Sequence, residues 1–154
     1  MELTKILVIR LNEILLDGKW VTGTNIKNEI IDLDWRKATM KIDSLNSIAD
    51  ITFHIDYYIA GVLNFFENGK LEIKDKYSFD SKPINSQKDW KDLIDKFCDD
   101  SEKFVKVVRN MTDKELEKTF ADEKYGTILR NINVIIEHSY YHLGQIILIK
   151  KLMK

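Results

Sequence analysis

Apolar residues recur at intervals of three and four in four long segments of the chain, with charged residues between them. The first segment contains Leu3, Ile6, Leu7, Leu11, Ile14 and Leu15. This spacing places the apolar side chains on one side of an α-helix. The pattern stops at Asp17 and Gly18, where glycine favours the end of a helix. The segment therefore predicts a first helix that packs one face against a core.

Start and stop signals bound a long second helix. Ser47 followed by Asp50 is a variant of the capping box, in which two side chains bond the free backbone groups of the first turn. The apolar pattern then runs to Phe66, and Gly69 closes it. Residues 18–46, ahead of this helix, carry weaker signals. NIKNEIIDLDW predicts a short helix, and ATMKIDSL fits either a bridging strand or irregular chain.

Two further long helices are predicted in the second half of the chain. Ser86 with Asp89 marks the start of the third helix, which continues through WKDLIDKFCDDSEKFVKVVRN. The fourth begins after Gly126 and Thr127 and follows an apolar run to Leu152. No proline interrupts either segment, so both helices are expected to be continuous.

The connections between the long helices are unequal in length. Residues 70–85 contain the only proline and predict a long connection with one extended piece. Thr112 and Glu115 form a capping box that predicts a short helix over MTDKELEKTF. These elements predict an all-α fold, a four-helix bundle with long crossover connections. A chain of 154 residues suits a single domain, residues 1–154.

Composition and charge narrow the classes of function. Hydrophobic residues make up 44% and charged residues 32% of the chain, a balance typical of globular domains rather than disordered or membrane-embedded chains. The 24 basic and 25 acidic residues are interspersed and give a net charge of −1. Because no positive field extends along the chain to hold phosphates, nucleic acid is not expected as a partner.

The number of cysteines and the character of the first segment indicate where in the cell the protein is located. Cys98 is the only cysteine, so the sequence predicts no internal disulfide and a reducing, cytoplasmic location. The opening MELTKILVIRLNEILL is apolar but carries Glu2, Lys5, Arg10 and Glu13. It therefore predicts neither a signal peptide nor a membrane-spanning helix, and no membrane partner is expected.

The three histidines are the candidate chemistry. His138 and His142 lie one helical turn apart in EHSYYHLGQI, close enough on a helix for both imidazoles to reach one ion. His54 lies midway along the second long helix, and a bundle can bring it to face the pair. Core packing is the alternative, because a histidine among apolar residues is commonly buried without a metal. Three histidines on two facing helices favour a metal site.

The segments around these histidines resemble a known family. SIADITFHI is similar to an S-x-A-E-x-x-x-H segment, and HSYYHLGQI to an H-x-x-x-H-x-G-Q segment, of the DinB superfamily of DinB/YfiT-like bundle proteins. The order and spacing of the helices agree over nearly the whole chain. Leu143 is a departure, since many relatives have arginine after the last histidine.

The resemblance implies a fold, a metal and a reaction class. Family members are four-helix bundles, often homodimers, whose three histidines bind a divalent ion such as zinc or nickel. By that resemblance His54, His138 and His142 are the metal ligands. Characterised branches transfer low-molecular-weight thiols such as bacillithiol, mycothiol or glutathione, so the resemblance implies a thiol cosubstrate and a small-molecule electrophile. We place entry of the electrophile on the side of residues 70–85.

Three further residues are candidates for support of the site. Asp50 lies one turn before His54 and either accepts a hydrogen bond from its ring or only caps the helix. Tyr58 lies one turn after His54 and either lines the site or packs in the core. Gln145 follows His142 by three residues and is expected to support it.

The function predicted from these observations is a metal-dependent enzyme, foremost a thiol S-transferase. A metal-dependent hydrolase is a related alternative. A second class is a non-catalytic bundle whose metal is structural or sensory, which predicts a closed site and unfolding on metal loss. A third is a bundle that binds no metal and uses its core for dimerisation, in which the histidines face solvent or one another.

Overall fold

Four long helices form the bundle, and shorter helices lie in its connections. The computed structural model describes residues 2–153. Within this range the long helices are α1 (Leu3–Leu15), α4 (Ile48–Asn68), α5 (Gln87–Arg109) and α7 (Ile128–Leu152). The shorter ones are α2 (Ile26–Ile30), α3 (Trp35–Ala38), α6 (Asp113–Leu116) and the 3₁₀ turns η1 (Asp75–Tyr77) and η2 (Glu123–Tyr125). The predicted all-α bundle is confirmed.

Local signals in the sequence account for both ends of α4. The Ser47 hydroxyl accepts a hydrogen bond from the backbone N–H of Asp50, and the Asp50 carboxylate accepts one from the N–H of Ser47. Both bonds satisfy backbone donors that the first turn of a helix leaves free. At the other end Gly69 has a φ of 73°, a left-handed conformation that strains other residues. The helix therefore has a fixed register, which fixes the direction of His54.

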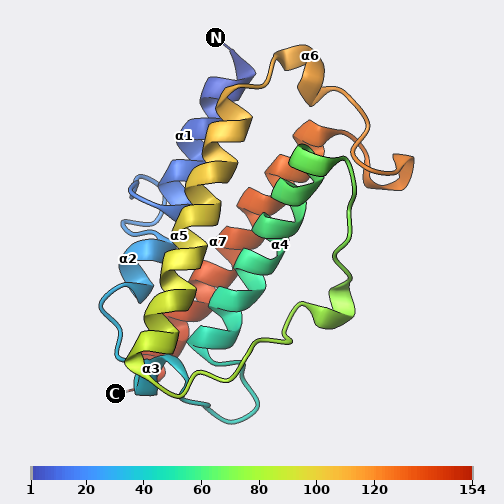
Figure 1. Cartoon of the computed structure of the whole chain (residues 1–154). Helices are drawn as coiled ribbons and strands as arrows, with labels where there is room; N and C mark the ends of the chain where they lie inside the picture. Colours follow the sequence, from blue (N-terminus) through green and yellow to red (C-terminus); the bar gives the residue numbers. More distant parts are fainter. Residues whose placement is uncertain (1, 154) are drawn as a thin grey trace.

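The long helices form a ring in which each packs against two neighbours. α4 packs against α5 and α7, and α1 packs against the same two helices. Figure 1 shows that α4 and α5 run in the same direction, whereas α7 runs opposite to α4. Because parallel neighbours start at the same end, the connection between α4 and α5 must travel the length of the bundle. It does so along the outside of α4 (Figure 1).

Apolar side chains fill the centre, with Trp90 and Phe97 among the largest that are fully buried. One polar cluster lies between α4 and α5, where Lys96 bonds the carboxylates of Asp56 and Asp100 at 2.6 and 2.5 Å. Burial raises the pKa of Asp56 to about 6, against the lowering effect of Lys96. Within residues 2–153, none of the helices combines the length and apolar character that crossing a membrane requires.

One predicted helix is shorter in the structure, and the 70–85 connection contains a turn that was not predicted. The short helix expected over MTDKELEKTF ends at Leu116, because the chain then turns to form an isolated bridge between Thr119 and Thr127. Within residues 70–85 the backbone of Lys74 is extended, and the turn η1, which was not predicted, follows it. The Tyr57 hydroxyl bonds both the N–H and the carbonyl of Lys74. Both backbone groups of Lys74 are thus bonded to α4.

Candidate metal centre

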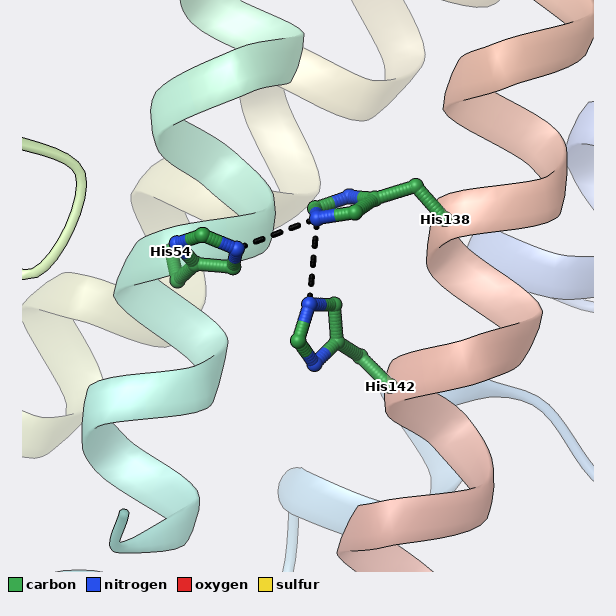
Figure 2. Close-up of side chains that lie close together, drawn as sticks. All are labelled: His54, His138 and His142. Atoms are coloured by element: carbon green, nitrogen blue, oxygen red, sulfur yellow. Dashed lines mark hydrogen bonds between the residues drawn. The ribbon is translucent and has the colours of Figure 1, made fainter. Parts of the chain in front are cut away.

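Two helices that are far apart in the sequence bring three histidines together. His54 projects from α4, and His138 and His142 project from α7 toward it (Figure 2). The Nε2 atom of His138 lies 3.0 Å from Nε2 of His54 and 3.0 Å from Nε2 of His142. One ring nitrogen from each residue lies within 4.8 Å of the others. His54 and His142 are buried, and His138 is half-buried.

The spacing of these nitrogens suits a small divalent ion. With metal–nitrogen bonds of about 2.0–2.1 Å, two ligands of a tetrahedral ion lie roughly 3.3 Å apart. The two measured separations of 3.0 Å are close to that value. Within residues 2–153, no fourth histidine, cysteine or carboxylate joins the cluster. Three protein ligands leave at least one coordination position for water or a substrate.

Hydrogen bonds outside the cluster orient two of the rings. Nδ1 of His54 donates to the backbone carbonyl of Ser78 at 3.2 Å, and Nδ1 of His142 donates to the side-chain oxygen of Gln145 at 2.6 Å. A carbonyl oxygen only accepts, so each Nδ1 carries the proton and each Nε2 presents a lone pair. The Nε2 lone pairs of His54 and His142 both point toward His138. Gln145 therefore supports His142, as a metal-binding histidine requires.

The third ring, His138, completes the arrangement. Its Nε2 lies between the Nε2 lone pairs of His54 and His142, so in the metal-free protein its proton is shared between them. One proton cannot fully satisfy two acceptors. Moving that proton to Nδ1 would leave three inward lone pairs, the donor set of a His₃ site. The residues present therefore fit a divalent ion.

Burial keeps the three rings neutral. Burial, together with the nearby His142 and His54, lowers the pKa of His138 to about 4. Burial likewise lowers the pKa of His54 and of His142, although the Ser78 carbonyl and Gln145 respectively oppose the effect. Neutral imidazole is the form that binds metal. The site is thus ready for an ion at neutral pH.

A covering segment, residues 74–79, closes the α4 side of the cluster. The ring of Phe79 stacks on His54 with centroids 4.0 Å apart and planes 9° apart. The Tyr58 ring meets His54 and His138 edge-on, and its hydroxyl donates to Asp75 at 2.8 Å. Tyr58 thus lines the cluster, which is one of its two predicted positions, the other being the core. Asp75, Ser78 and Phe79 were not predicted, and the length of the 70–85 connection was their only signal.

The Asp50 carboxylate forms no hydrogen bond with any of the three histidines. Its carboxylate accepts from the Ser47 backbone and from Lys41, and these bonds hold its pKa below the usual range although burial acts in the opposite direction. Of its two predicted roles, Asp50 therefore fills the one at the start of the helix. The ring of His54 instead bonds the Ser78 carbonyl, which comes from a segment that sequence spacing cannot place.

A comparison with family models assigns the chain to a protein family. A model described as "Protein of unknown function (DUF1572)" matches residues 24–154. The chain belongs to the DUF1572 family. The match covers all three histidines and both helices that carry them. Searches of curated proteins and of solved structures gave no match. Because the DUF1572 description states no reaction, the function must be inferred from the site itself.

Proposed function

We propose that this DUF1572 protein is a metal-dependent enzyme of the DinB superfamily that binds a divalent ion, zinc or nickel foremost, through His54, His138 and His142. One observation carries the proposal: the acceptors on Nδ1 of His54 and His142 direct their Nε2 lone pairs to one point. In a packed core without metal, such lone pairs would need donors, and His138 supplies a single proton for both.

The chemistry we propose is thiol S-transfer to a small electrophile. A bound divalent ion would supply uncompensated positive charge, because three imidazoles are neutral, and would lower the pKa of a thiol or water that it binds. Around it the chain supplies orientation. Ser78 and Gln145 hold two rings in place, and Phe79 shields the outer face of His54. Water in place of the thiol would give the related hydrolase.

The purely structural role for a metal receives less support from the fold. The apolar core extends along the bundle and includes Phe104, which packs against Phe66, twelve positions beyond His54 on α4. A domain of this size with such a core does not depend on one ion to fold. The helices are therefore expected to persist when the metal is removed, unlike those of a metal-dependent mini-domain.

The test is the metal content of untagged protein, reloaded with zinc or nickel after chelation. We expect about one ion per chain in wild type, as a single His₃ site holds, and loss of the ion in His54→Ala and His138→Ala. Exposed Glu137→Ala serves as the matched control on α7 and should retain the ion. Loaded protein is then assayed with thiols and electrophiles. Wild type that binds neither metal would exclude the proposal, and metal binding without thiol turnover would exclude the transferase.

A further inference from the structure

Aromatic rings lie against every histidine of the candidate metal centre. Phe79 stacks on His54 with ring centroids 4.0 Å apart, and Tyr58 meets His138 edge-on at 5.2 Å. A third ring, on α7, contacts the remaining histidine. The three rings come from the covering segment, from α4 and from α7, and we call them the aromatic frame: Phe79, Tyr58 and Tyr141.

The aromatic frame lies at the boundary between the cluster and solvent. On α7 the ring of Tyr141 meets His142 edge-on with centroids 4.9 Å apart, yet the residue has an exposed fraction of 65%. Phe79 is 40% exposed although it stacks on a buried histidine, and Tyr58 is half-buried. Each ring therefore touches a histidine on one side and water on another. A molecule that reaches the cluster from solvent must pass along these rings.

The exposure of Phe79 and Tyr141 is best explained by a ligand. Isolated exposed apolar side chains are ordinary on protein surfaces, whereas apolar walls around a few convergent polar groups are typical of small-molecule sites. These two residues come from segments far apart in the sequence, and both contact the same histidine cluster. Their rings therefore form walls beside the polar groups that an ion would bind.

The charged side chains near the cluster favour a ligand without negative charge. Asp75 accepts a hydrogen bond from the Tyr58 hydroxyl at 2.8 Å, which places a carboxylate beside the frame. Burial lowers the pKa of His54, and the Asp75 carboxylate opposes this effect. Within residues 2–153, no lysine or arginine acts on the pKa of any of the three histidines. A carboxylate or phosphate on a ligand would therefore meet Asp75 and find no side-chain cation to pair with.

We propose that the aromatic frame recognises an uncharged aromatic group on the molecule that binds the ion. Aromatic rings prefer offset-stacked and edge-on contacts with one another, and Phe79 and Tyr141 both have exposed ring surface for such contacts. The inference rests on the proposed function and makes it more specific. It narrows the thiol of the S-transferase to one that carries an aromatic ring and no negative charge.

Titration of cobalt-loaded protein with three thiols of similar size tests the proposal. Divalent cobalt accepts imidazole ligands as zinc does, its visible bands report loading, and a bound thiol adds an absorption band in the near ultraviolet. The thiols are benzyl mercaptan, cyclohexylmethanethiol, which lacks an aromatic ring, and 4-(mercaptomethyl)benzoate, which is anionic. Benzyl mercaptan should bind about twofold to tenfold more tightly than cyclohexylmethanethiol, the gain expected of an aromatic contact. The benzoate should bind more weakly than benzyl mercaptan, because its charge faces Asp75.

Variants separate recognition by the frame from intrinsic differences among the thiols. Tyr141→Leu and Phe79→Leu should each lower the ratio of the affinities for benzyl mercaptan and cyclohexylmethanethiol, whereas Tyr141→Phe retains the ring and should retain the ratio. Tyr125→Leu, at an exposed tyrosine outside the frame, is the matched control. Because the same two thiols are compared in every protein, their different acidities cancel from the change in the ratio.

Each outcome bears either on the aromatic frame or on the metal site. Cobalt-loaded wild type that binds the thiols without aromatic preference, or a preference unchanged in both leucine variants, would overturn the inference and leave the metal site intact. Equal affinity for the benzoate and benzyl mercaptan would overturn the exclusion of negative charge. Wild type that takes up no cobalt, or takes up cobalt but none of the thiols, would overturn the proposed function and this inference with it.

Discussion

Gln145 controls the tautomer of His142 at the centre of the candidate site. Its side-chain oxygen accepts the Nδ1 proton at 2.6 Å and thereby leaves the Nε2 lone pair free to bind an ion. The Ser78 carbonyl does the same for His54 through the backbone. Mutation can remove the first of these acceptors but not the second. Gln145 is therefore the residue through which the orienting effect can be measured.

Replacement of Gln145 by alanine should weaken metal binding by about 10-fold to 100-fold, the usual effect of removing a partner of a metal-binding histidine. Competition with a chromophoric chelator would measure the affinity for zinc or nickel. Gln145→Glu keeps an acceptor for the Nδ1 proton and should retain most of the affinity. Equal affinity in wild type and Gln145→Ala would show that the ring is oriented by packing alone.

Individual residues of the site differ in how far the sequence predicts them. The three histidines and Gln145 stand out because their spacing on helices implies shared faces. Ser78 and Phe79 could not be predicted, since a backbone carbonyl has no side-chain signature and the contact with His54 spans 24 positions. For Asp50, spacing allowed two roles equally, one in the helix cap and one at the site, and the structure shows the cap.

At the scale of elements, the covering segment depends on how the chain before it packs on α4. Ile73 sits directly on Gly61, where an added Cβ would lie 2.5 Å from Cγ2 of the isoleucine. Tyr57 then fixes Lys74 through two hydrogen bonds of 2.9 Å. These contacts place the segment that bonds and stacks on His54. Glycine at position 61 is thus needed for close approach of the chain.

The effect of Gly61→Ala on the free energy of unfolding should reverse sign when the residue at position 73 is changed. In wild type it should destabilise the protein by about 1–3 kcal/mol, because the new methyl group overlaps the isoleucine. In an Ile73→Ala background it should instead stabilise by up to about 1 kcal/mol, the helix-propensity gain of alanine over glycine. Urea unfolding of the four proteins of this cycle gives both values. Destabilisation of the same size in both backgrounds would contradict the contact.

At the scale of the whole molecule, the order and ends of the long helices follow from apolar spacing and caps. The irregular segments do not, because tertiary contacts decide them. The predicted helix over MTDKELEKTF was cut short when the chain turned into the bridge at Thr119 and buried Phe120. The 70–85 connection took its course from the parallel direction of α4 and α5, which local sequence does not encode.

The contribution of His138 to the stability of the metal-free protein should fall as pH drops from about 6.5 to about 4. An unfolded histidine has a pKa near 6.5, whereas that of His138 in the fold is about 4. Between these values the unfolded chain binds more protons, so acid favours unfolding. Asp56 acts oppositely, because its raised pKa of about 6 makes the fold bind a proton that the unfolded chain releases.

Comparison with His138→Gln separates the two effects, because Asp56 is present in both proteins. Urea midpoints at a series of pH values would give the difference in unfolding free energy between wild type and variant. This difference should shift against wild type as pH falls through the 4–6.5 window. A difference that is independent of pH would show that folding does not lower the pKa of His138.

The positions of the three histidines in the sequence also determine when the cluster can form during synthesis. His54 and His138 are separated by 84 positions, and α7, which carries two of the three histidines, is the last helix of the bundle. A ribosome-bound chain that ends before α7 holds only one of the three imidazoles. The three-histidine cluster can therefore form only after the other long helices have been made.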